Sequence, residues 1–205
     1  MDIRIYAIHV VPFVIIVYFA FVLFLHPPKA VILASLAGGL VMAVINALTD
    51  LLAYYASWWH YTASGLILQL PLPFYLTPML IYGGVAYMLI WRFGGTGQAQ
   101  GLHPSTQPPL VPTEASREAR GEGRCHWLAL AFLVGVPLLG FARDLLDAQV
   151  THASYLVWDS ALAGPIDFVL WLAMFYAGYA VFRLMLPGHS LRQRVSPMQG
   201  EKNSG

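Results

Sequence analysis

Charged residues are scarce in this sequence: Asp, Glu, Lys and Arg make up 10% of its 205 residues, while hydrophobic residues make up 58%. Soluble domains carry about 25% charged residues, so the composition indicates an integral membrane protein. A single cysteine, Cys125, is present, which excludes an internal disulfide and a cysteine-based metal site. Basic and aromatic residues are not interleaved as nucleic-acid binding requires, so we predict no nucleic-acid partner.

Several stretches of the chain are long and apolar enough to cross a membrane as helices. About 20 apolar residues, rising about 1.5 Å each, cover a hydrocarbon core of about 30 Å. We predict such helices over residues 7–25, 30–49, 72–93, 126–144 and 166–186. We expect the first to be retained as an anchor and not removed as a signal peptide, because His26-Pro27-Pro28-Lys29 is no small-residue cleavage site. The predicted fold class is an all-α integral membrane protein with five transmembrane helices.

Composition also divides the chain into segments. Between residues 94 and 124 it changes abruptly to Gly, Pro, Ser, Thr, Gln and Glu, which bury too little apolar surface to offset the entropy of ordering. The predicted segments are an N-terminal anchor helix at 1–29, a first two-helix unit at 30–93, a disordered cytoplasmic linker at 94–124, a second two-helix unit at 125–187 and a disordered basic tail at 188–205. Within the second helix, Ala34, Gly38 and Gly39 are small enough to let another helix approach closely.

One segment, from Asp50 to Ala86, recurs. A shift of 94 residues places it on Asp144 to Ala180 without gaps, with 11 of 37 positions identical. Matched Asp, Pro, Gly and Tyr residues in one register are harder to obtain by chance than matched leucines. We therefore interpret the chain as one N-terminal helix followed by a tandem repeat of two-helix units. Two helices separate the starts of the units, so both insert in the same direction and form a parallel repeat.

Basic residues fall mostly on one side of the predicted topology. That side holds Lys29, Arg92, Arg117, Arg120, Arg124, Arg183, Arg192, Arg194 and Lys202. The other side holds only Arg4 and Arg143. The positive-inside rule then predicts that the N-terminus lies outside and that the linker and C-terminus lie in the cytoplasm. We expect the membrane to be the plasma membrane.

Acidic residues near the membrane gather on the opposite, outer side. They are Asp50, Asp144, Asp147, Asp159 and Asp167, with His60 and His152 nearby. Charged groups at membrane depth are costly, so those present usually face the bundle interior, pair, or serve function. Because the repeat makes Asp50 and Asp144 equivalent, we predict that they face each other as a catalytic carboxylate pair. Such a pair could share a proton or, with the two histidines, hold a divalent cation.

Simpler interpretations exist for these acids. Asp50 and Asp144 lie near helix ends, where interfacial water could solvate them. Asp147 follows Arg143 by four residues, the spacing of a helix-surface ion pair. Asp167 opens the last helix, where a carboxylate favours the helix N-terminus.

The two histidines give little support to a metal site. His60 and His152 do not align in the repeat register, since they fall on Ser154 and Trp58. Neither belongs to a recognised ligand spacing. We therefore predict neither a bound metal nor a cofactor.

Aromatic side chains border the acids in both units. The predicted substrate-binding residues are Trp58, Trp59, His60, Tyr61, His152, Tyr155, Trp158 and Asp167. Trp and Tyr also collect at membrane interfaces, so the alternative for the aromatic members is an interfacial belt.

The order of an acid, an aromatic segment, a proline and an apolar helix resembles membrane carotenoid-biosynthesis proteins. Trp59-His60-Tyr61-Thr62 followed by Leu70-Pro71-Leu72-Pro73 looks like the carotenoid 1'-hydroxylase-like family. Gly164-Pro165-Ile166-Asp167-Phe168 is similar to the proline-x-acid-acid motif of the lycopene cyclase domains, which are built from tandem three-helix units. The first unit departs from that motif, with Pro73-Phe74 where the cyclases have acids. The resemblance covers about half the chain and implies a long isoprenoid lipid as the substrate class.

Together these observations predict a membrane-embedded enzyme or accessory protein acting on an isoprenoid-type membrane lipid, with Asp50 and Asp144 as its acid pair. The alternative is a non-catalytic membrane protein. It would be either a small transporter-like bundle or a scaffold whose linker and tail recruit partners.

Overall fold

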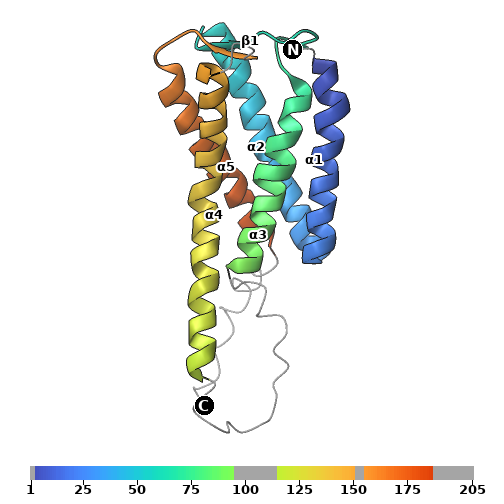
Figure 1. Ribbon diagram of the computed structural model, residues 1–205, viewed down its shortest axis with the longest axis vertical. Coiled ribbons are helices and arrows are strands. Elements are labelled where there is room, and N and C mark those ends of the chain that lie inside the picture. The colour runs from blue at the N-terminus through green and yellow to red at the C-terminus, as the bar shows by residue number, and fades with distance from the viewer. Residues whose placement is uncertain (1–2, 95–114, 151–154, 187–205) are drawn as a thin grey trace, which may run out of the picture.

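The computed structural model describes residues 3–94, 115–150 and 155–186, without the side chains of 115–126 and 150. Its helices run side by side along one axis (Figure 1). They are α1 (Ile3–Leu25), α2 (Lys29–Tyr55), a composite third helix, α4 (Ala115–Val150) and α5 (Ala163–Met185). Within the described residues, five helical spans are long and apolar enough to cross a membrane. The predicted number of spans is therefore confirmed, while the repeat and the orientation in a membrane stay predictions.

The third span is not the regular helix predicted over residues 72–93. It consists of η1 (Leu72–Tyr75), a 3₁₀ turn, then η2 (Pro78–Val85), a π-helical segment, and then α3 (Ala86–Phe93). Pro78 has no amide hydrogen and so cannot make the regular helical hydrogen bond there. The wide π turn also brings Gly83 against α2, where a Cβ on Gly83 would lie 2.5 Å from the Cα of Gly39.

Several predicted helix boundaries differ from the structure. Helix α1 begins at Ile3 and not at residue 7, and α4 continues past residue 144 to Val150. Helix α2 continues past Thr49 to Tyr55, because its acidic residue at position 50 is hydrogen-bonded inside the bundle and does not end the helix. Helix α4 begins at Ala115, so residues 115–124 belong to a helix and not to the predicted disordered linker. Extending an existing helix needs no new nucleus, which lowers the cost of adding these residues. Helix α5 begins at Ala163, three residues before the predicted Ile166.

Two short strands join the loops at one end of the bundle, a feature that the all-α prediction lacks. Strand β1 (Trp59–Tyr61) pairs antiparallel with β2 (Leu156–Trp158), and Trp59 lies opposite Trp158. Backbone hydrogen bonds from Asp159 N to Trp58 O and from Thr62 N to Tyr155 O, each 2.9 Å, extend the pairing. Strands of three residues carry no alternating pattern long enough to recognise in a sequence.

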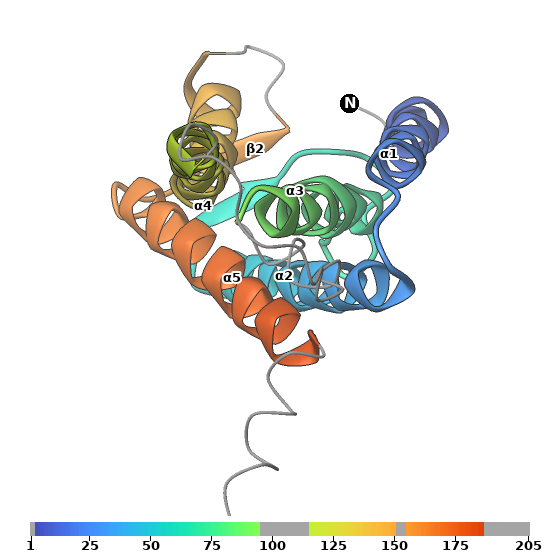
Figure 2. The same ribbon diagram turned by 90° about the horizontal axis from the view of Figure 1, so that it is seen from below.

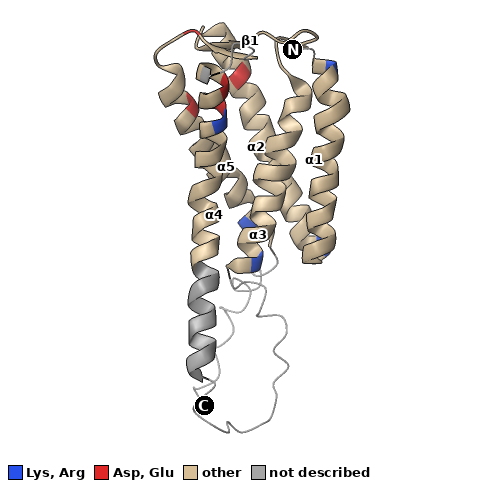
Figure 3. Cartoon of the chain, in the orientation of Figure 1, with Lys and Arg blue, Asp and Glu red and all other residues tan. Residues whose placement is uncertain are grey.

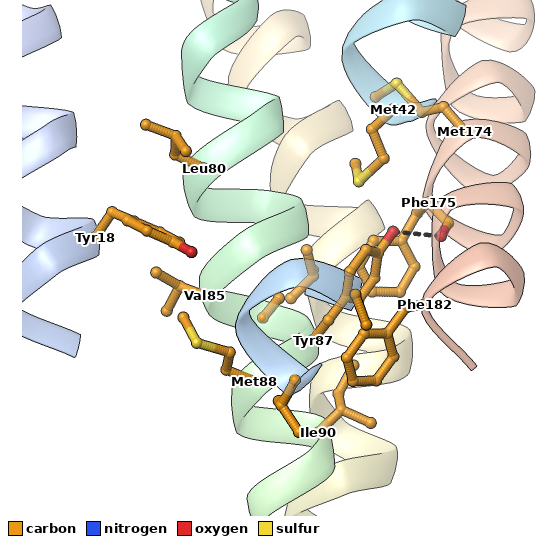
Figure 4. Packing of buried hydrophobic residues seen from close by; sticks show 14 of the residues in the cluster. Tyr18, Met42, Leu80, Val85, Tyr87, Met88, Ile90, Met174, Phe175 and Phe182 are labelled. Atoms are coloured by element: carbon orange, nitrogen blue, oxygen red, sulfur yellow. Dashed lines mark hydrogen bonds between the residues drawn. The ribbon is translucent and has the colours of Figure 1, made fainter. Parts of the chain in front are cut away.

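The core lies where α2, α5 and the third span meet, with α1 at the edge of the bundle (Figure 2). A Cβ on Gly38 would lie 2.6 Å from the carbonyl oxygen of Gly178, so α2 and α5 touch through their backbones. This confirms that the small residues of α2 admit another helix. Tyr87 fills the space beside this contact, and its hydroxyl donates to the carbonyl of Phe175 at 2.7 Å (Figure 4).

Charge separates along the axis of the bundle. The described acids lie at the end that carries β1, together with some basic positions, and the other end shows basic positions alone (Figure 3). Lys29 begins α2, and Arg92 and Arg183 lie in the last turns of α3 and α5. Between the two ends the outer surface is apolar: Ile8, Phe13, Ile16 and Phe24 of α1 are between 64% and 81% exposed. Such a surface matches a hydrocarbon surround.

Candidate functional site: a buried acid cluster

Asp50 is a buried carboxylate with three side-chain donors. It lies in the last two turns of α2 and is 4% exposed. Its Oδ1 accepts from Trp59 Nε1 at 3.0 Å, and its Oδ2 accepts from the hydroxyls of Tyr61 at 3.0 Å and Tyr75 at 2.8 Å. The alternative in which interfacial water solvates this acid is therefore wrong. Helix α2 runs past position 50, and the loop and η1 fold their donors onto the carboxylate.

Asp144 is the second buried carboxylate, on α4, and is 8% exposed. Its Oδ1 accepts from Arg143 Nε at 2.9 Å and Nη2 at 2.6 Å, and its Oδ2 accepts from Trp171 Nε1 at 2.7 Å. The guanidinium also lies over the rings of Tyr82 and Trp171, 5.9 Å and 5.7 Å from their centroids, where cation–π attraction holds it. Solvation by interfacial water is wrong for this acid too, because a cation and an indole occupy its oxygens.

Asp167 is the third buried acid, 6% exposed on α5. Its Oδ2 is buried and has no hydrogen-bond partner within the described part of the chain. Because α5 begins at Ala163, Asp167 lies in the second turn and not in the first. The unbonded amides of a helix N-terminus belong to its first four residues, so the helix-terminus interpretation of Asp167 is wrong. Asp167 instead lies within electrostatic range of Asp144, Asp50 and Arg143.

Stacked aromatic rings connect the two halves of the site. Tyr61 and Tyr155 are nearly parallel, with centroids 6.5 Å apart, and Phe74 meets Tyr155 edge-on at 4.9 Å. Burial, with the charge of Asp50, raises the pKa of Tyr61, and burial also raises the pKa of Tyr155. Both phenols therefore keep their protons at ordinary pH. Each donates to an acid: Tyr61 to Asp50, and Tyr155 to Asp147 Oδ2 at 2.6 Å.

Of the remaining predicted residues, His60 lies toward the surface, and Trp58 and Trp158 are half-buried. His60 Nδ1 contacts Asp159 Oδ2 at 2.7 Å, and both side chains are about one-third exposed or more. Trp58 packs in the small apolar cluster under the strands, and Trp158 lies against Gly164. His152 lies outside the described residues.

Two donors of this site escaped the sequence reasoning, and Arg143 was considered only as a partner for Asp147. In the repeat register Trp171 falls on Thr77 and Tyr75 falls on Val169, so the repeat does not point to either residue. Residues four apart share one face of a helix, so the spacing of Asp167 and Trp171 indicates that Trp171 lies on the same side of the last helix as an acid of the site. Nothing comparable in the sequence connects Tyr75 to Asp50.

Asp50, Asp144 and Asp167 lie within electrostatic range of one another, but the hydrogen bonds of the first two run to other groups. Among the described residues, no set of three or more His, Cys, Asp or Glu side chains is arranged to hold a metal ion. What the arrangement offers is two carboxylates supplied with donors, beside a third carboxyl group with an unsatisfied oxygen.

Comparison with protein-family models, with curated proteins and with solved structures finds no match to this chain.

Proposed function

We propose that the protein is a membrane-embedded enzyme, or the accessory subunit of one, that performs acid chemistry on an isoprenoid-type lipid. The observation that carries the proposal is the pair of buried carboxylates, Asp50 and Asp144, each provided with donors at one end of an apolar bundle. Isoprenoid alkenes react with acids through carbocations. A fixed negative charge in a low-dielectric site stabilises such a cation far better than water-screened charge does.

The surroundings of the acids also suit such a substrate. Tyr61, Tyr155 and Phe74 form an aromatic group next to the cluster, and the negative faces of aromatic rings attract cations. A substrate dissolved in the bilayer could approach along the apolar outer surface of the helices. The site in this proposal consists of Asp50 and Asp144 with these rings, and the surface pair of His60 and Asp159 is not part of it.

The packing of the bundle favours this function over transport. Below the acid cluster, Met42, Tyr87, Met174 and Phe175 are all 0% exposed and fill the described core (Figure 4). Transporters bind substrate near the middle of the membrane and expose it alternately to both sides. The acids here lie at one end, and a filled core separates them from the other end.

The test is the lipid and pigment profile of a carotenoid-producing host, by chromatography with mass spectrometry. The host would express the wild-type chain, the Asp50→Asn/Asp144→Asn double variant, or Asp159→Asn, which changes an exposed acid at the same end. We expect a new cyclised, isomerised or hydrated product with the wild type and with Asp159→Asn, and its loss with the double variant.

Two outcomes would contradict the proposal, provided that the variants are expressed and inserted equally. Identical profiles for all three chains and the empty host would remove isoprenoid chemistry. A phenotype that survives the double variant but disappears when residues 95–114 are deleted would favour the scaffold.

A further inference from the structure

The three buried acids of the cluster differ in their hydrogen-bond partners. Asp144 faces Arg143 on its own helix, and both donating nitrogens of that guanidinium bond the same oxygen of Asp144. Asp50 on α2 has three neutral donors. The third acid, Asp167, has an oxygen with no donor among the described residues.

The neighbours of Asp167 on every packed element make its ionised form unfavourable. Helix α2 presents Asp50, and α4 presents Asp144 together with Arg143. The η2 segment presents Tyr82, whose ring lies beneath the guanidinium. Two negative charges and a cation already bonded elsewhere offer little compensation to a third buried anion. A buried carboxylate without a partner is neutralised rather than ionised.

We propose that Asp167 is held as a neutral carboxylic acid at neutral pH and is the proton donor of the cluster, while Asp50 and Asp144 stay ionised. The three acids thus divide into one donor and two anions. The same burial has different consequences because Asp50 has three neutral donors and Asp144 has a cation and an indole, whereas Asp167 Oδ2 has no partner among the described residues.

This assignment rests on the proposed function for its chemical consequence. The O–H bond of Asp167 breaks as its proton forms a C–H bond with one alkene carbon, using the alkene π pair. The other alkene carbon becomes a cation that the carboxylates of Asp50 and Asp144 stabilise. In isomerisation, a C–H bond adjacent to the cation then breaks, its electron pair forms the new alkene, and its proton goes to the carboxylate of Asp167. In cyclisation, the π pair of a neighbouring alkene first forms a C–C bond to the cation, and the C–H bond that breaks lies next to the new cation that results. The net change is cyclisation or isomerisation, which needs no oxidant or reductant.

The protonation state can be measured without any substrate. Infrared spectroscopy of the full chain in lipid vesicles at neutral pH detects the carbonyl stretch of a protonated carboxylic acid, which shifts in deuterated water. We expect one such band in the wild type, its loss in Asp167→Asn, and its persistence in Asp50→Asn and in the exposed control Asp159→Asn. Asn has nearly the shape of the neutral acid, so we expect Asp167→Asn to fold.

Absence of the band from the wild type, or its persistence in Asp167→Asn, would overturn the assignment. If Asp167→Asn fails to fold, the carboxylic acid bands of the wild type are followed as the pH is raised from acidic values. The disappearance of all of them near pH 4, about where an exposed Asp carboxyl ionises, would equally overturn the assignment. The experiments test the two proposals separately. If the band is assigned to Asp167 but the chain makes no isoprenoid product, this inference stands and the proposed function is removed. A product made without the band means that another group donates the proton.

Discussion

At the scale of single residues, three hydrogen-bond donors hold the side chain of Asp50 in place. An ionised carboxylate inside an apolar bundle is tolerated only where hydrogen bonds replace its water. Tyr75 makes the shortest of the three, at 2.8 Å, and it comes from a different span. Its hydroxyl therefore fixes Asp50 and also ties the third span to α2.

Removing this hydroxyl should lower stability. For Tyr75→Phe we expect a loss of roughly 1–2 kcal/mol in the free energy of unfolding, because one donor to a buried charge disappears while the ring remains. Thermal unfolding in detergent, followed by circular dichroism, measures the change. Tyr55→Phe is the matched control, since Tyr55 is 77% exposed and should lose almost nothing. Equal behaviour of the two variants would mean that the Tyr75 hydrogen bond contributes no stability.

At the scale of helices, the contact between α2 and α5 depends on two glycines that face each other. A Cβ on Gly38 would lie 2.6 Å from the carbonyl oxygen of Gly178, and a Cβ on Gly178 would lie 2.5 Å from that of Gly38. Backbone atoms cannot move aside as a flexible side chain can. The helices must separate if either glycine gains a methyl group.

We therefore expect Gly38→Ala and Gly178→Ala each to destabilise the protein by roughly 1–3 kcal/mol, the usual cost of overpacking. Gly135→Ala makes the same chemical change on α4, where a Cβ would meet nothing within 4 Å, and should be close to neutral. Detergent unfolding curves of the three variants compare these sites. Helix propensity favours Ala over Gly at every one of these positions, so a loss at Gly135 as large as at Gly38 would show that the α2–α5 contact does not set the cost.

At the scale of the whole molecule, the two ends of the bundle differ in charge and so predict an orientation. The end away from the acids shows basic positions alone, and the start of α2 and the last turns of α3 and α5 hold Lys29, Arg92 and Arg183. Lys and Arg are enriched on the cytoplasmic side. The acid cluster should then face the outside.

Thiol labelling tests this orientation. In a Cys125→Ser background, Ser64→Cys places a thiol in an exposed position of the loop after β1, and His26→Cys places one between α1 and α2 at the other end. A membrane-impermeant maleimide added to intact cells should label Ser64→Cys, and should label His26→Cys only after the cells are opened. The reverse pattern would place the acids on the cytoplasmic side.

Much of this architecture could be predicted from the order of the residues alone. Five apolar runs predict five spans because length and hydropathy suffice for such segments, and the small residues Gly38 and Gly39 predict a close helix contact. Asp50, Asp144 and Asp167 stood out because acids are rare in apolar runs. The predictions about the surroundings of these acids were wrong. The helices containing them have other bounds, two strands lie beside them, and Asp50 and Asp144 are buried and not solvated.

Only the tertiary structure decided which groups meet. The donors of Asp50 come from a strand and from η1, nine to 25 residues along the chain, and Trp171 reaches Asp144 from another helix. The close approach of the π-helical segment Pro78–Val85 to Gly39 of α2 likewise joins residues that are distant in the sequence. Hydropathy acts residue by residue and can be read along the sequence. Hydrogen bonding of a buried carboxylate depends on distance between segments, so folding alone determines which of the three acids is left without a donor.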